Sequence, residues 1–238
     1  IKDDPAVTTA EPILETPAGG TAYGICFHPQ FAENGYLYAG WYGALEKPPE
    51  GSRGRPPKRS YATRYTFDRE KGTIDPKSEL HVISWESDGH NGADVEFATD
   101  GMFLITSGDG TSDSDTNLRG QDLTQLTSKI PRIDVDHPAE GKNYRVPHDN
   151  PFVGQAGIVP ETWAYGLRNP WRITVDPQTG HVWTAQNGQD LWEQVYFVKK
   201  RDNYGWSVYE GSHVFYANRQ MGPHPLTLPS AEHHHNEA

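Results

Sequence analysis

The sequence contains one cysteine, no long apolar run and fewer basic than acidic residues. The single cysteine, Cys26, excludes an internal disulfide and any cysteine-based metal cage. It lies in the apolar run 23–27, so we expect a buried small residue rather than a nucleophile. No stretch approaches the roughly 20 consecutive apolar residues of a membrane span. The net charge of −11 argues against a nucleic-acid-binding protein, which would usually present a basic surface.

Several common catalytic signatures are also missing. The zinc motif HExxH, the nucleophile elbow GxSxG and the phosphate-binding loop GxxxxGK[ST] do not occur. The acidic run that includes Asp109, Asp113 and Asp115 resembles a calcium loop. An EF-hand counted from Asp113 requires glycine at its sixth position, where this chain has Leu118. We therefore reject an EF-hand.

Glycine, proline and aromatic residues are abundant, which is typical of many short strands and turns. The 238 residues include 24 Gly, 19 Pro, 12 Tyr and 7 Trp. The only helical candidate is short, around 117–126, and Pro131 must occupy an edge or a bulge of its strand. We predict strands over 23–27, 36–41, 61–67, 79–84, 95–97, 102–106, 130–135, 171–175, 181–185, 194–198 and 204–208.

Two segments are expected outside the strands. Residues 1–17 are polar and rich in proline and threonine, and predict an extended lead-in. Residues 43–60 are rich in proline, arginine and lysine and predict a long exposed loop. This loop is either a solvated insertion or a docking site for an acidic partner.

Residues 161–193 form the most informative stretch. Strands 171–175 and 181–185 flank a turn of proline and glycine. If Asp176 pairs with His181 in an antiparallel hairpin, Asn169 faces Gly188. The polar residues before the first strand, Arg168 and Asn169, would then meet a loop of bare backbone after the second. Such a corner on a rigid scaffold is typical of a functional site.

A second hairpin repeats this plan. Asp100-Gly101 predicts a two-residue turn between strands 95–97 and 102–106. The register then brings Gly92 opposite Asp109 and places His90 close to that carboxylate. Because both hairpins present polar groups at their open ends, the repeated strand–turn–strand plan predicts an all-β fold of the β-propeller type.

The residues alone leave two interpretations open at each candidate position. A histidine oriented by an aspartate is the usual general-base arrangement, but His90 is equally compatible with a structural role. Arg168 has a guanidinium that suits an anion or a quinone oxygen, and it could equally be a buried arginine bonded to loop carbonyls.

Seven motifs in order give the chain a family resemblance over roughly residues 19–215. It resembles the soluble glucose/sorbosone dehydrogenases, which are pyrroloquinoline-quinone (PQQ)-dependent aldose sugar dehydrogenases built on a six-bladed β-propeller. The motifs are GICFHPQFAENGYLYAGW, HNGADVEFATDGMFLITSGDG, GQDLTQLTSKIPRIDVD, YRVPHDNPF, PETWAYGLRNPWRITVDPQTGHVW, NGQDLWEQV and NYGWSVYEG.

The resemblance implies specific roles. His90 matches the catalytic base that takes the proton of the anomeric hydroxyl while hydride passes to the quinone, and Asp109 matches the carboxylate that supports it. Arg168 and Asn169 match the pair that contacts the quinone, with Arg168 stabilising the charge that develops on it. Metal ligands are also implied: the carbonyls of Asn187 and Gly188 for the calcium bound to the quinone, and Glu193 with the carbonyl of Tyr204 for a structural calcium, with Glu210 nearby as a weaker candidate.

The resemblance covers only part of a ring. We expect residues 1–238 to form one incomplete propeller domain with about half to two-thirds of the blades. Further quinone contacts in the family come from later blades, so we expect the chain alone to bind the quinone poorly. The family also implies an aldose substrate and a periplasmic or secreted location. Whether a cytochrome or another acceptor takes the electrons, and whether the protein is a homodimer, stays open.

Two other functions compete with sugar oxidation. Hedgehog-interacting proteins use a related propeller for binding without redox chemistry. A calcium-dependent sugar lactonase is also a propeller, and would require several carboxylates that converge on one metal. The joint presence of His90, Asp109, Arg168 and Asn169 favours the dehydrogenase, since a binding module need not keep all four.

Overall fold

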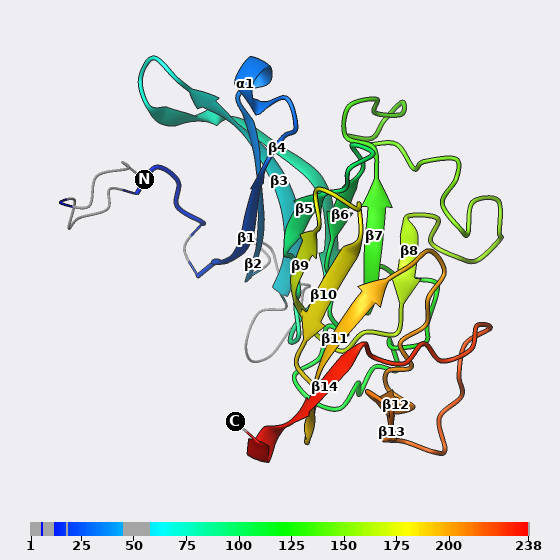
Figure 1. The fold of residues 1–238 in the computed structure, drawn as a ribbon. Helices are drawn as coiled ribbons and strands as arrows, with labels where there is room; N and C mark the ends of the chain where they lie inside the picture. The colour runs from blue at the N-terminus through cyan, green and yellow to red at the C-terminus, as the bar shows by residue number, and fades with distance from the viewer. Residues whose placement is uncertain (1–5, 7–11, 18, 45–57, 238) are drawn as a thin grey trace, which may run out of the picture.

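The computed structural model describes residues 6, 12–17, 19–44 and 58–237, and three four-stranded antiparallel sheets dominate it (Figure 1). In the first and second sheets the strands follow chain order from β1 to β4 and from β5 to β8, whereas the third has the order β14-β11-β10-β9. The strands of the first sheet are β1 (Thr21–Phe27), β2 (Tyr36–Ala44), β3 (Lys58–Asp68) and β4 (Thr73–Glu86). The strands of the second are β5 (Val95–Phe97), β6 (Phe103–Ile105), β7 (Lys129–Ile133) and β8 (Thr162–Tyr165). The strands of the third are β9 (Pro170–Val175), β10 (Val182–Gln186), β11 (Trp192–Val198) and β14 (Ala231–His234).

Four smaller elements complete the fold. They are the helix α1 (Phe31–Asn34), the ribbon of β12 (Tyr209–Glu210) and β13 (His213–Val214), and the 3-10 helix η1 (His235–Glu237). Among the described residues, no helix has the length and apolar character needed to cross a membrane.

The sheets pack face to face with the second in the middle, and their first strands β1, β5 and β9 lie next to one another (Figure 1). Because both faces of the second sheet are covered, every residue of β6 is buried. Alternation along the strand sends Phe103 and Ile105 into the core shared with the first sheet and Leu104 into the core shared with the third. Three blades fanned about their first strands match the predicted propeller plan.

The two hairpins differ from their predicted registers in instructive ways. Asp176 does pair with His181, as expected. A bulge between Ala185 and Gln186 then shifts the pairing by one residue, so Asn169 meets Asn187 instead of Gly188. In the other hairpin Ala98, not Thr99, pairs with Met102, because Gly101 adopts a left-handed φ of 81° and lengthens the turn to three residues.

Several element predictions need correction. Residues 117–126 form turns, since side chains such as Asp115 and Asp122 bond local backbone N–H groups in place of helical carbonyls. Residues 204–208 are not a strand, since 206–208 form a turn, and the strands β8, β12, β13 and β14 were not predicted. Part of the predicted loop 43–60 belongs to β2 and β3, while 45–57 lies outside the described residues, as does most of the lead-in 1–17. The predicted bulge at Pro131 and the burial of Cys26 are confirmed.

Candidate active site at the open ends of two hairpins

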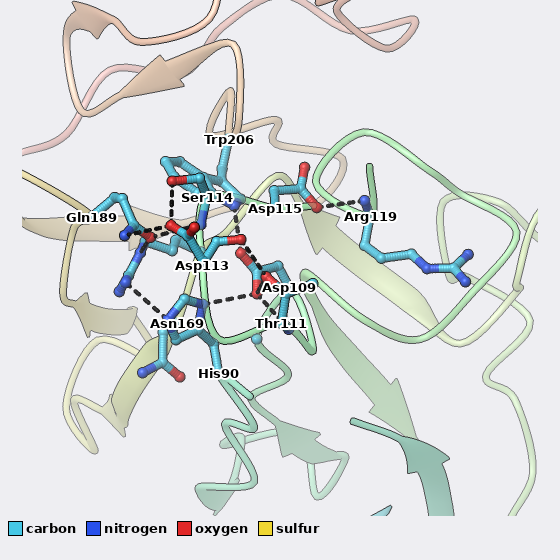
Figure 2. Close-up of polar contacts among 12 residues, drawn as sticks. His90, Asp109, Thr111, Asp113, Ser114, Asp115, Arg119, Asn169, Gln189 and Trp206 are labelled. Atoms are coloured by element: carbon cyan, nitrogen blue, oxygen red, sulfur yellow. Dashed lines mark hydrogen bonds and ion pairs between the residues drawn. The ribbon is translucent and has the colours of Figure 1, made fainter. Parts of the chain in front are cut away.

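The open ends of the β5–β6 and β9–β10 hairpins meet in one polar cluster, which Figure 2 shows in close-up. The backbone joins them directly, because Asp109 N–H donates to the Arg168 carbonyl over 2.8 Å. Gly108 allows this approach: a Cβ there would lie 2.2 Å from the His90 carbonyl oxygen and 3.0 Å from that of Arg168. A glycine is therefore required where the two hairpins touch.

His90 and Asp109 form the predicted pair. Nδ1 of His90 lies 2.8 Å from Oδ1 of Asp109, whose side chain is fully buried, while 14% of the His90 side chain is exposed. An ionised carboxylate only accepts hydrogen bonds, so Nδ1 carries the ring proton and donates a hydrogen bond to Asp109. The opposite nitrogen, Nε2, lies 2.9 Å from Nη2 of Arg168. Since a guanidinium only donates, Nε2 is unprotonated and its electron pair accepts from Arg168, and a general base needs such an unprotonated nitrogen.

Arg168 binds loop acceptors on three sides. Its Nε donates to Gln189 Oε1 at 2.9 Å, Nη1 to the Asn187 carbonyl at 3.1 Å, and its backbone N–H to Gln186 Oε1 at 2.9 Å. Burial lowers the pKa of Arg168 from its ordinary value, opposed mainly by the charges of Asp109 and Glu210. A guanidinium nevertheless stays charged in proteins. The site thus holds a buried cation next to the imidazole.

Asn169 lies beside this cation and is 4% exposed. Its Nδ2 donates to Asn187 Oδ1 at 3.2 Å, whereas its Oδ1 is buried and has no hydrogen-bond partner within the described part of the chain. A buried acceptor without a partner costs free energy unless a ligand or water satisfies it. The structure thus brings together the predicted residues His90, Asp109, Arg168, Asn169 and Asn187.

The remaining predicted metal ligands are placed differently. Gly188 belongs to the same loop as Asn187, and Glu210 fixes that loop by accepting the N–H groups of Gln189 and Asp190. Glu193 instead bonds Nε2 of His235 at 2.7 Å. Tyr204 is buried, and its ring packs 4.4 Å from that of Tyr196, three residues along β11 from Glu193. These contacts concern the Glu193 carboxylate and the Tyr204 ring, whereas the predicted calcium ligand is the Tyr204 carbonyl oxygen, so the structural calcium stays a prediction. In the described part of the chain, no three acidic, histidine or cysteine side chains cluster so that they could hold a metal ion, and a calcium ion here would therefore depend on backbone carbonyl oxygens.

Three contributors to the site were not predicted. Thr111 bonds Asp109 through both its N–H and its hydroxyl, Gln189 holds Arg168, and Trp206 donates its indole N–H to Asp109 (Figure 2). Trp206 lies 97 residues from Asp109 in the sequence, so no local spacing of residues could predict this contact. Its position in the NYGWSVYEG motif was the only available signal.

Comparisons with known proteins show what the chain is similar to. The family model described as Glucose / Sorbosone dehydrogenase matches residues 2–234. The HIPL2 protein of Arabidopsis thaliana is 31% identical over 90% of this chain and 37% of its own length. Hedgehog-interacting protein of Mus musculus is 28% identical over 64% of this chain and 22% of its own length.

A solved structure extends the comparison to the fold. The PQQ-bound form of aldose sugar dehydrogenase from Streptomyces coelicolor superposes with a TM-score of 0.65 at 25% identity. The match covers 95% of this chain and 57% of the other, so the chain spans little more than half of that enzyme. The predicted all-β propeller class, present in part, is confirmed.

Proposed function

This chain belongs to the glucose/sorbosone dehydrogenase family, and from that premise we propose that it carries the acid–base half of a sugar-oxidising active site. The reaction is oxidation of the anomeric CH–OH group of an aldose, with PQQ and calcium as cofactors. The observation that carries the proposal is His90, whose Nδ1–H is held by buried Asp109 and whose Nε2 faces the Arg168 cation.

The residues present fit a quinone at this corner. The Arg168 guanidinium is a donor that suits a quinone oxygen, and it faces the loop of Asn187. Asn169 Oδ1, a buried acceptor without a partner in the described residues, suits an N–H group of the ligand or a cation. The residues that would hold calcium here are Asn187 and Gly188, whose carbonyl oxygens are the hard ligands that calcium prefers. The Asn187 carbonyl is engaged by Arg168 Nη1, so that bond must open for the carbonyl to bind a cation.

The residues of this chain would accept the proton of the sugar and stabilise the negative charge that develops during its oxidation. When bound, the calcium-associated quinone supplies a carbonyl that accepts hydride and its electron pair. His90 Nε2 accepts the proton of the anomeric hydroxyl, and Asp109 holds the imidazole in orientation and stabilises the imidazolium that results. Arg168 must release Nε2 for this to happen, and its guanidinium then faces the negative charge that develops nearby. The second calcium, at Glu193 and Tyr204, stays a prediction.

A second candidate function is binding without chemistry. The similarity to hedgehog-interacting protein favours it, because that protein matches 64% of this chain. The joint presence of an oriented histidine, its buried carboxylate and an adjacent arginine favours the enzyme, since binding alone does not need a base with an unprotonated nitrogen.

The test uses the protein that carries this chain, reconstituted with calcium and PQQ. We expect a redox dye to be reduced on addition of at least one sugar from a panel of aldoses, and the same protein with His90→Gln to reduce it far more slowly. A fragment of residues 1–238 is expected to bind quinone poorly and to turn over slowly. Absence of dye reduction with every aldose, from folded protein, would overturn the enzyme and leave the binding function. Fractionation of the native cells tests the further proposal of a periplasmic or secreted location.

A further inference from the structure

The carboxylate of Asp109 has two oxygens with very different surroundings. Oδ1 accepts from His90 Nδ1 at 2.8 Å, from the Thr111 N–H at 2.9 Å and from the Thr111 hydroxyl at 3.1 Å. Oδ2 accepts from the Trp206 indole N–H at 2.8 Å. Because Asp109 is fully buried, water cannot replace a lost donor at low cost. The indole therefore fixes the rotation of the carboxylate.

Trp206 is itself held rigidly. Its backbone N–H donates to the Gly166 carbonyl at 2.9 Å, and its carbonyl accepts from Gln121 Nε2 at 2.7 Å. A Cβ on Gly120 would lie 2.1 Å from that carbonyl oxygen, so the backbone at Gly120 packs directly against the backbone of Trp206. The side chain is 1% exposed and packs 5.1 Å from the Phe215 ring. An indole anchored at both its backbone and its ring can transmit a fixed position to Asp109.

Trp206 also contacts the cation of the site. The central carbon of the Arg168 guanidinium lies 5.9 Å from the indole ring centroid, within the range of a cation–π contact. One side chain thus touches both groups that flank His90, namely its carboxylate and its arginine. Each of these groups is on a different hairpin, and Trp206 comes from neither.

We propose that Trp206 is a positioning residue for His90, which acts through the orientation of Asp109 and the placement of Arg168. The proposal rests on the proposed sugar oxidation for its kinetic consequence, but its structural consequence stands without catalysis. Loss of the indole N–H leaves a buried carboxylate oxygen without a donor, and Asp109 can then rotate away from His90. Substrate binding should suffer less than the proton transfer that His90 performs.

The test compares Trp206→Phe with Trp41→Phe. Phenylalanine keeps an aromatic ring and removes the N–H, and Trp41 is a matched control because its buried indole donates to Thr63 Oγ1 at 3.0 Å in the first sheet. In the protein reconstituted with calcium and PQQ, we expect Trp206→Phe to lower kcat about 10- to 100-fold with KM changed less than about threefold, the range of a general-base contribution partly lost. Trp41→Phe should keep kcat within about twofold.

A spectroscopic arm separates this proposal from the proposed function. In protein without cofactors, the proton resonance of the His90 Nδ1–H bound to Asp109 should move or broaden in Trp206→Phe and stay unchanged in Trp41→Phe. If Trp206→Phe does not fold, the contact is measured from the other side. The resonance of the Trp206 indole N–H is then compared between the wild type and Asp109→Asn, where it must shift. An unmoved resonance in either arm, or an equal loss of kcat in Trp41→Phe, would overturn the positioning role. An inactive wild type with a shifted His90 resonance would instead refute only the sugar oxidation.

Discussion

The β5–β6 and β9–β10 hairpins share one plan and contribute different chemistry. Both connect antiparallel strands through a glycine-containing turn and gather polar residues at the open end. The first supplies a histidine and its buried carboxylate, whereas the second supplies a buried arginine and an amide. The first pairs regularly, while the second carries a bulge. The candidate functional groups of this fold therefore lie at the ends of the hairpins and not within the strands.

The bulge explains how the two ends cooperate. The bulge lies next to the open end of the β9–β10 hairpin. At this end, Arg168 bonds the Asn187 carbonyl of its own hairpin and Nε2 of His90 on the other hairpin. The first hairpin needs no bulge, because His90 and Asp109 meet across their own hairpin. We therefore expect substitutions of His90 or Asp109 in the first hairpin to lower the rate of sugar oxidation. Substitutions of Arg168 or Asn169 in the second hairpin should instead weaken the binding of the cofactor.

The largest effect is expected at Asp109. Asp109→Asn removes the acceptor that fixes the His90 tautomer, and by analogy with other Asp–His pairs the rate of dye reduction should fall on the order of 10³- to 10⁴-fold. Quinone affinity, measured by titration of the protein without sugar, should change little. A decrease of less than tenfold in rate would show that His90 does not depend on this carboxylate.

The junction between the hairpins should be intolerant of added volume. Gly108→Ala places a methyl group 2.2 Å from the His90 carbonyl oxygen and should lower the free energy of unfolding by about 3 kcal/mol, measured by urea denaturation. Gly101→Ala is the matched control at the opposite end of the same hairpin. Gly101 has a φ of 81° and no heavy atom within 4 Å, so only backbone strain of about 1 kcal/mol is expected. Equal losses would argue against a close junction.

Arg168 should affect binding more than the proton transfer. Arg168→Gln keeps hydrogen-bonding capacity toward the loop and removes the cation, so we expect the quinone to bind roughly 10- to 100-fold more weakly. At saturating quinone the remaining rate should exceed that of Asp109→Asn. Titration of quinone into both variants checks this order, and the reverse order would contradict the division of labour between the hairpins.

A second buried cation, outside the candidate site, affects stability alone. Lys129 is fully buried under the first hairpin, donates to the Asp122 and Thr127 carbonyls, and has its pKa lowered by burial to about 7. Between this value and about 10.5 the unfolded chain binds more protons at this group than the folded chain, so its contribution makes stability rise with pH by up to about 1.4 kcal/mol per unit. In Lys129→Met this increase should be absent. Urea denaturation of both proteins from pH 7 to pH 9.5 measures the difference, and parallel pH curves would contradict it.

The sequence predicted what depends on local pattern. Strand periodicity located most strands, and the Asp176–His181 register followed from turn chemistry. The bulge at Ala185 and Gln186 and the left-handed Gly101 each shift pairing by one residue. Gly101 marks a turn but not whether that turn has two or three residues, and no residue type marks the bulge. The helix expected at 117–126 fails because its polar side chains bond the local backbone.

Long-range contacts set the limit for the site. Hairpin register could bring His90 to Asp109, and Asn169 to the loop of Asn187 and Gly188, because each of these pairs spans one turn. Trp206 could not, because it reaches Asp109 from 97 residues away and its segment was predicted as a strand. Thr111 and Gln189 were missed because common polar residues in loops carry no distinctive spacing.

We propose that the two hairpin ends form one redox site with His90 as its base. This proposal is tested most directly by a single-turnover experiment on the protein that carries this chain, loaded with calcium and PQQ and mixed anaerobically with an aldose. We predict that the absorbance of the bound quinone changes to that of its reduced form in the wild type, and that His90→Gln binds the quinone equally but reduces it on the order of 10²- to 10⁴-fold more slowly. Equal rates in the two proteins, or no reduction by any aldose in a folded and loaded wild type, would contradict the claim.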